Sequence, residues 1–291
     1  RDYYASRGLG DVYKRQTVFQ MSEEMFFLHY GKDGCNRHVL IDECRELFGE
    51  IYEQIPELPF CNIWTAMQLS SRLPKGALFH MGVSNTRRCW NMFQLPESVE
   101  SACNVGCCGI DGCVSTLVGA SLVNPDRLCY VVVGDLTFFY DLNSLGNHHI
   151  GTNLRVMLVN NGRGTEFRLG IHHCNVFGDD ADKYMAAAGH FGNKSPLLVK
   201  HYAEDLGFHY LSATTKEEFM TALSNFTNPQ LSDHSMILEV FTDSKDESEA
   251  LYLMSHIQSD AKGMVRSKLK DAVRNVAGEK GINAIKKILK K

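Results

Sequence analysis

The chain has 291 residues, of which 44% are hydrophobic, and a formal net charge of -4 at pH 7. This length and apolar content can bury one large core or two modest ones, so a folded globular protein is expected. The small acidic excess gives no electrostatic case for a nucleic-acid partner, which usually shows as a basic excess over a whole domain. Ten scattered cysteines without a Cys-x-x-Cys pair or a secretory segment indicate reduced thiols in the cytoplasm.

The beginning of the chain differs in character from the remainder of the sequence. Residues 1–16 show no apolar periodicity and resemble translated adapter sequence, so we interpret them as a non-native leader. Residues 17–60 combine a short aromatic run, a Gly-Lys-Asp-Gly turn and an amphipathic stretch over Val39–Ile55. We interpret them as the end of a preceding domain followed by a linker helix.

Residues 61–250 alternate between helical patterns and short apolar runs rich in β-branched residues. The pattern predicts helices over residues 62–73, 109–122, 200–207 and 217–225, and strands over residues 77–82, 128–133, 154–159 and 236–241. This alternation predicts an α/β fold, with a doubly wound, mostly parallel sheet covered by helices on both faces.

Residues 251–291 form a basic segment at the other end of the chain. From Ala261 to Lys291, ten Lys or Arg residues stand against two acidic ones, with apolar residues at helical spacing. The pattern predicts an amphipathic helical tail. A solvated or subunit-packing helix is the preferred interpretation, and contact with an anionic membrane surface is the alternative.

Polar residues follow two of the predicted strands directly. Asp135 comes after the run CYVVVG, and Asn160 and Asn161 come after VMLV, with 24 residues between Asp135 and Asn160. That interval is long enough for a crossover helix that returns the chain to the same sheet edge. Ligands of open parallel sheets bind at this edge, and an oxygen-only ligand pair suits Mg²⁺. The alternative is a simple turn and a strand-terminal cap.

The Gly-Asp and Asn-Asn pairs at this interval resemble the signature of thiamine-diphosphate-dependent enzymes. The segments GVSNTRR, NVGCCGIDGCVST and GDLTFFYDLNSLG, in this order, resemble the branch containing the menaquinone-pathway synthase of 2-succinyl-5-enolpyruvyl-6-hydroxy-3-cyclohexene-1-carboxylate (SEPHCHC synthase). The resemblance implies the C-terminal, diphosphate-binding domain of such an enzyme. It implies thiamine diphosphate and Mg²⁺ as cofactors, with the metal held by Asp135, Asn161 and the main-chain carbonyl of Arg163.

Other positions acquire expected roles through the same resemblance. Ile110 would support the bent cofactor from below, and Gly109 would precede a helix whose N–H groups face the diphosphate. An ordinary core isoleucine and a plain helix start are the alternative. The remaining cofactor-binding positions implied are Gly134, Leu136, Gly164 and Phe167.

Three positions bear on the substrate. Arg88 falls where the branch places an arginine for substrate carboxylates, a role suited to a guanidinium group. Val105 replaces a second arginine, and Glu166 replaces an aliphatic residue beside the cofactor. Glu166 could therefore donate or accept a proton near the reaction centre. A surface arginine and a solvent-facing glutamate are the alternatives.

The resemblance implies decarboxylation or carboligation of a 2-oxo acid, on a substrate different from that of SEPHCHC synthase. It also implies a homodimer or homotetramer and a pyrimidine-binding domain, which we do not recognise in this sequence, so the chain alone should be inactive. The alternative function is a non-catalytic, cofactor-binding or regulatory subunit.

Overall fold

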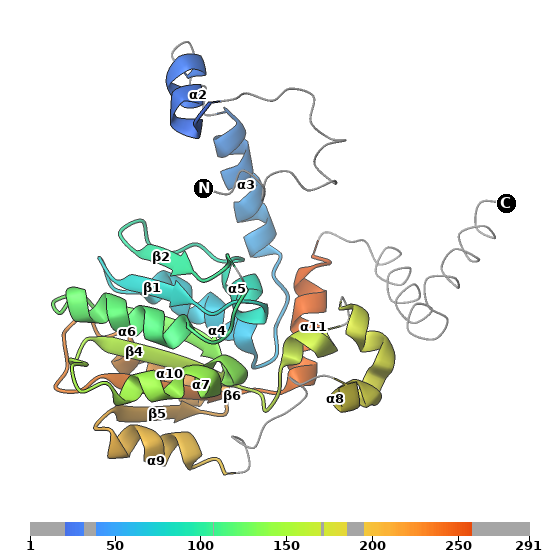
Figure 1. The fold of residues 1–291 in the computed structure, drawn as a ribbon. Coiled ribbons are helices and arrows are strands. Elements are labelled where there is room, and N and C mark those ends of the chain that lie inside the picture. Colours follow the sequence, from blue (N-terminus) through green and yellow to red (C-terminus); the bar gives the residue numbers. More distant parts are fainter. Residues whose placement is uncertain (1–20, 32–38, 107, 170–171, 185–194, 258–291) are drawn as a thin grey trace. The chain divides into compact units, whose positions relative to one another are not determined.

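The computed structural model describes residues 21–31, 39–106, 108–169, 172–184 and 195–257 (Figure 1). The expected leader over residues 1–16 and most of the basic tail lie outside the described residues. By its internal contacts the chain divides into two compact units, residues 1–53 and 54–291. Each unit is therefore described by itself.

The described residues of the first unit form two helices, α2 (Glu23–Tyr30) and α3 (Val39–Glu53). The hydroxyl of Ser22 caps α2 by accepting a hydrogen bond from the N–H of Met25 at 3.2 Å. No residue of α2 is buried, and Phe27 is 68% exposed. The amphipathic stretch predicted as a linker helix is helical and ends two residues earlier than predicted.

The second unit is built on a six-stranded, all-parallel sheet with the strand order β2-β1-β3-β4-β6-β5 (Figure 1). The predicted α/β fold with a doubly wound parallel sheet is thereby confirmed. The strand bounds are β1 (Leu78–Met81), β2 (Glu100–Cys103), β3 (Cys129–Gly134), β4 (Leu154–Asn160), β5 (His209–Ala213) and β6 (Met236–Phe241).

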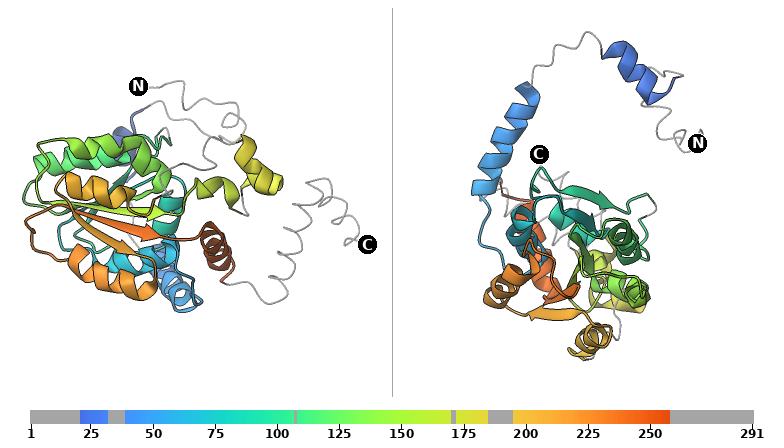
Figure 2. Two further views of the ribbon diagram at one scale, coloured as in Figure 1. Left: turned by 90° about the horizontal axis from the view of Figure 1, so that it is seen from below. Right: turned by 90° about the vertical axis from the view of Figure 1, so that its left-hand side faces the viewer.

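Helices cover both faces of this sheet (Figure 2). One core lies under α4 (Asn62–Leu69), α5 (Asn85–Trp90), α10 (Lys216–Phe226) and α11 (Ser244–Met254), and the other under α6 (Cys113–Val123), α7 (Asp135–Asp141) and α9 (Leu198–Asp205). Within β3, Tyr130 and Val132 enter the first core while Val131 and Val133 enter the second. This alternation explains why the central strands are mostly apolar: both of their faces are buried.

Several element boundaries differ from those predicted. The helix predicted over residues 62–73 ends at Leu69 and continues as a 3₁₀ turn over Ser70–Arg72. The helix predicted over residues 109–122 begins only at Cys113. The edge strands β2 and β5 were not predicted, because edge strands bury less surface and their sequences, ESAC and HYLSA, carry polar residues.

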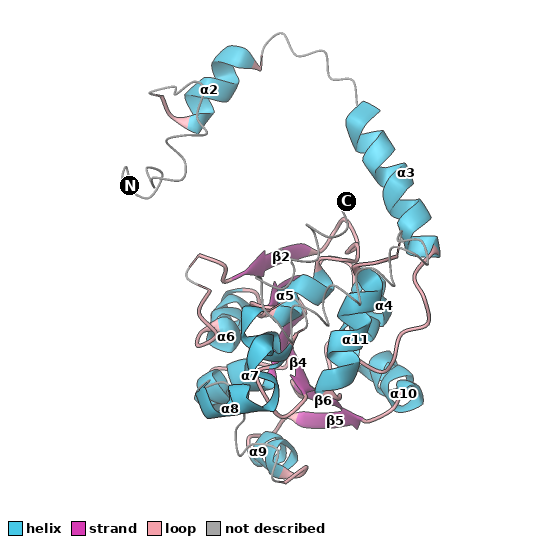
Figure 3. Ribbon diagram, turned by 90° about the vertical axis from the view of Figure 1, so that its right-hand side faces the viewer, coloured by secondary structure: helices cyan, strands magenta, loops and turns pink. Residues whose placement is uncertain are grey.

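The region after β4 carries short helical segments. A 3₁₀ turn spans Thr165–Arg168, a second 3₁₀ segment spans His173–Asp180, and α8 follows over Ala181–Tyr184. Figure 3 shows α5, α7, α8 and α11 near the strand ends from which this region departs. In the described part of the chain, no helix has both the length and the apolar character required to cross a membrane.

Candidate cofactor and metal site

A cavity of about 320 Å³ opens at the carboxyl ends of β3 and β4. Its wall combines the loop after β1 with the first turns of α5 and α7 and the segment that follows β4. Of the positions singled out in the sequence, it is lined by Ile110, Gly134, Asp135, Leu136, Asn161, Arg163, Gly164 and Glu166. Segments far apart in the chain thus meet in one cavity, because parallel strands bring their carboxyl ends to one edge.

Asp135 and Asn161 follow two strands that are direct neighbours in the sheet. In the parallel pairing of β3 with β4, Gly134 stands opposite Val159, so Asn161 lies one residue further along this register than Asp135 does, and both residues line the cavity. Asp135 is 2% exposed, and its Oδ1 accepts the N–H of Leu136 at 2.8 Å. Gly162, with a φ of 81°, turns the chain immediately after Asn161. The two side chains therefore share one cavity wall.

The oxygens at this wall suit a hard divalent cation. Asn161 Oδ1 is buried and has no hydrogen-bond partner among the described residues, which is unusual for a buried amide oxygen. A carboxylate, an amide oxygen and a main-chain carbonyl are the ligand types that Mg²⁺ accepts, together with phosphate oxygens and water. Over the described residues, no group of three or more His, Cys, Asp or Glu side chains gathers to hold a metal ion. The donor set here matches Mg²⁺ rather than a zinc site.

Asn160, the other half of the Asn-Asn pair, has a separate task. Its Nδ2 donates to Glu239 Oε1 at 2.7 Å, and the hydroxyl of Tyr210 donates to Glu239 Oε2 at 2.7 Å. Glu239 is 1% exposed, and burial raises the pKa of its carboxyl group. This network joins the start of β5 to β6 and to the carboxyl end of β4, and it helps to fix the backbone from which Asn161 departs.

Arg88 pairs with Glu166, which lines the cavity, whereas Arg88 itself is not among the lining residues. Arg88 Nη1 lies 2.8 Å from Glu166 Oε2, and Nη2 lies 2.9 Å from Oε1. The side chains are 33% and 20% exposed, respectively, and the hydrogen bond that Arg88 donates to Glu166 raises the pKa of Arg88. Two residues that the sequence singled out separately thus form a single two-pronged ion pair.

The segment before α6 is irregular. Gly109 does not line the cavity, whereas Ile110 and Cys108 do. The side chain of Asn104 donates to Gly112 O at 3.2 Å and to Thr116 Oγ1 at 3.1 Å, so it holds the loop against the first turn of α6. Helix α6 begins at Cys113, four residues after the predicted start at Gly109. The side chain of Phe167 lies outside the described residues.

A buried carboxyl group lies behind the cavity. Glu247 of α11 is 1% exposed, and its Oε1 accepts the N–H of Asn62 at 3.0 Å and the hydroxyl of Thr242 at 2.8 Å. Burial, followed by smaller contributions that include the charge of Asp135, raises the pKa of Glu247 to about 7. The Oδ1 of Asn62, which lines the cavity, accepts the indole N–H of Trp90 at 3.0 Å.

Sequence reasoning missed Glu239, Glu247 and Asn62. A signal existed for Glu239, since a glutamate inside the apolar strand MILEVF must find partners once it is buried. Glu247 stands in a charged segment, SKDESEALYLM, that reads as a solvated helix start. Only the packing of α11 against α4 reveals its burial.

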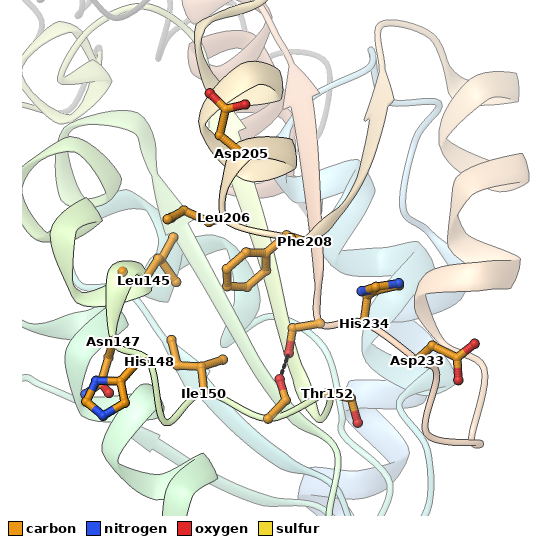
Figure 4. Close-up of a pocket in the computed structure, with 14 residues that line it drawn as sticks. Leu145, Asn147, His148, Ile150, Thr152, Asp205, Leu206, Phe208, Asp233 and His234 are labelled. Atoms are coloured by element: carbon orange, nitrogen blue, oxygen red, sulfur yellow. Dashed lines mark hydrogen bonds between the residues drawn. The ribbon is translucent and has the colours of Figure 1, made fainter.

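A second cavity, of about 450 Å³, lies at the opposite edge of the sheet, where β4, β5 and β6 begin. His148 and His234 stand on opposite sides of it, with Ile150 and Phe208 between them (Figure 4). It includes neither strand tip carrying Asp135 or Asn161. The amino and carboxyl edges of the sheet are thus chemically distinct.

The fold and the first cavity define a doubly wound α/β protein with an oxygen-rich ligand site at the carboxyl ends of its strands. No family model matches the chain. Curated proteins named 2-succinyl-5-enolpyruvyl-6-hydroxy-3-cyclohexene-1-carboxylate synthase do match the chain. The synthase from Bacteroides fragilis is 34% identical over 196 residues. These residues are 67% of this chain and 34% of that protein. The corresponding enzyme from Phocaeicola vulgatus is 34% identical over 200 residues, and that from Christiangramia forsetii 33% identical over 199.

The matched part of this chain is a homologue of the SEPHCHC synthases, and the resemblance seen in its motifs is confirmed. The match spans about a third of the length of these relatives: 34% of the enzymes from B. fragilis and P. vulgatus and 33% of that from C. forsetii.

Proposed function

We propose that this chain is the diphosphate- and metal-binding part of a thiamine-diphosphate-dependent enzyme that acts on 2-oxo acids by decarboxylation or carboligation. The observation that carries the proposal is the convergence of Asp135 and Asn161 on one cavity from neighbouring strand ends. The Oδ1 of Asn161 supports it: this buried oxygen accepts no hydrogen bond from any described residue, and a cation would stabilise it. The homology to named synthases supports the enzyme class.

In this proposal, Asp135, Asn161 and the carbonyl of Arg163 would hold Mg²⁺, whose charge would stabilise a diphosphate at this wall. Gly134, Leu136 and Gly164 form the wall against which the cofactor lies, and Ile110 contacts it from the loop before α6. Gly109 and Phe167 complete the expected cofactor-binding positions. When bound, the thiazolium ring supplies the electron sink for the charge that decarboxylation leaves. The protein residues bind, orient and shield from water.

Arg88 and Glu166 are proposed to act on the substrate side of the cavity, where Glu166 lines the wall. Their ion pair gives this wall a carboxylate that is already engaged with a guanidinium. Because such a pair alters which acids can bind, we propose a substrate different from that named for the relatives. We also propose that catalysis requires a pyrimidine-binding domain, in a homodimer or homotetramer. A non-catalytic role gains no support from the relatives, whose names are those of enzymes.

The proposal is tested by calorimetric titration of the chain with thiamine diphosphate, with and without Mg²⁺. Binding should require Mg²⁺, and Asp135→Asn or Asn161→Ala should weaken it by about tenfold or more, since each removes one metal ligand. Asp233→Asn is the matched control, because this carboxylate lies at the second cavity. Binding that is independent of Mg²⁺, or equally weakened by Asp233→Asn, would contradict the proposed site.

A further inference from the structure

The Arg88–Glu166 pair has the geometry with which arginine binds the carboxylate of a ligand. Both terminal nitrogens of Arg88 donate, one to each oxygen of Glu166, at 2.8 and 2.9 Å. Two parallel hydrogen bonds of this kind combine directionality with charge, and they are stronger than bonds between neutral groups. The side chain of Glu166 therefore occupies the face of Arg88 that a ligand carboxylate would use.

The pair is neither fully solvated nor sealed in the core. Arg88 is 33% and Glu166 20% exposed, and Glu166 lines the cavity wall. A carboxylate entering from the cavity would have to displace Glu166 from the guanidinium. Glu166 would then remain as a half-buried carboxylate in a cavity that also contains Asp135, and losing the partner of a partly desolvated charge is costly.

We propose that Glu166 is a built-in counter-ion that occupies Arg88 and makes the site select 2-oxo acids without a second carboxylate. The statement that the ligand is a 2-oxo acid rests on the proposed function. The selection itself rests on the ion pair and its place in the cavity. Removing the charge of Glu166 frees the guanidinium and creates a binding site for the distal carboxylate of a dicarboxylic acid.

The test compares two 2-oxo acids of equal chain length, 2-oxopentanoate and 2-oxoglutarate, by calorimetric titration of the full chain in the presence of thiamine diphosphate and Mg²⁺. The wild type should bind 2-oxoglutarate no more tightly than 2-oxopentanoate. Glu166→Gln should improve 2-oxoglutarate binding by about tenfold, the size of one charge-assisted contact, and leave 2-oxopentanoate unchanged. The double variant Arg88→Gln with Glu166→Gln should lose this gain.

Glu204→Gln is the matched charge control. It removes one carboxylate from the exposed Lys200–Glu204 pair on α9, where the charges are 3.9 Å apart, and should change neither affinity. Thermal unfolding and circular dichroism check that each variant is folded, and Glu166→Ala provides a second way to remove the carboxylate.

Three results would overturn the inference: a wild type that prefers 2-oxoglutarate tenfold, no gain in either folded Glu166 variant, or a gain that survives the loss of Arg88. The titrations are repeated without cofactor, which separates this inference from the proposed function. A gain from Glu166→Gln in a chain that does not bind thiamine diphosphate would support the counter-ion and reject only the cofactor assignment.

Discussion

Glu247 accepts a hydrogen bond from the backbone N–H of Asn62 at 3.0 Å, although the two residues are 185 positions apart. Asn62 is the first residue of α4, and the preceding Cys61 provides no side-chain cap, so Glu247 supplies the missing acceptor from α11. The same Oε1 accepts the hydroxyl of Thr242, which follows β6. One buried carboxyl group thus ties α4 and α11 to the end of the sheet beside the cavity.

The burial of Glu247 should make stability depend on pH. Its pKa is about 7 in the folded protein, raised chiefly by burial from an ordinary value of 4.5. A group whose pKa is raised on folding stabilises the folded state in its protonated form. This contribution is complete below pH 4.5 and is lost as the pH rises through 7. Relative to Glu247→Gln, the wild type should lose up to about 3 kcal/mol of unfolding free energy between pH 4.5 and 8. Urea unfolding of both proteins across this range measures the difference, and parallel pH profiles would contradict it.

The Tyr210–Glu239 hydrogen bond should contribute measurably to stability. Tyr210→Phe deletes one of the two donors to a buried carboxyl group, so the free energy of unfolding should fall by about 1–3 kcal/mol. Tyr202→Phe is the matched control, since the hydroxyl of Tyr202 donates to the neutral carbonyl of Leu142 at 2.8 Å. Its loss should cost about 1 kcal/mol. If Tyr210→Phe and Tyr202→Phe lowered the unfolding free energy equally in urea, the hydrogen bond to the Glu239 carboxyl group would be no stronger than one to a carbonyl.

Helix α10 should depend on its N-cap. The hydroxyl of Thr215 accepts the N–H of Glu218 at 3.2 Å, while Glu218 Oε2 accepts the N–H of Thr214 at 2.7 Å. Thr215→Ala should lower the unfolding free energy by about 1 kcal/mol. Thr221→Ala within the same helix should stay within about 0.5 kcal/mol of the wild type, because Thr221 is exposed and its hydroxyl donates only to the carbonyl of Glu217 within the helix, at 2.9 Å. A similar loss in both variants would indicate a general threonine effect.

Native thiol labelling should distinguish two exposed cysteines from two buried ones in the described part of the chain. Burial raises the pKa of Cys61 to about 12 and also raises that of Cys89, so neither forms the reactive thiolate. Cys44 and Cys108 are free and exposed. A brief treatment with iodoacetamide at pH 8, followed by peptide mass spectrometry, should modify Cys44 and Cys108 and spare Cys61 and Cys89 until urea is added. Early labelling of Cys61 or Cys89 would mean that the core around α4 opens readily.

Much of the fold was predictable from local pattern. The strands β3, β4 and β6 are mostly apolar on both faces. Their sequences therefore predict both their conformation and their central place in a parallel sheet. The polar residues that follow β3 and β4 mark the sheet edge where ligands bind. Asp135 and Asn161 could be selected for this reason, since the carboxyl ends of parallel strands lie at the same edge of a sheet. The adjacency of β3 and β4 then brings both residues to one cavity.

Tertiary structure decided the rest. The strand order, the edge strands β2 and β5, and the burial of Glu239 and Glu247 depend on which surfaces pack together, and no short-range periodicity encodes that choice. Arg88 and Glu166 are 78 positions apart and looked like independent residues until the fold paired them. The sequence determined which chemical groups stand at the strand ends, because this follows from local periodicity and chain direction. Only packing decided which of those groups neutralise one another, because hydrogen bonds and charges act through space over a few ångströms, whatever the separation along the chain.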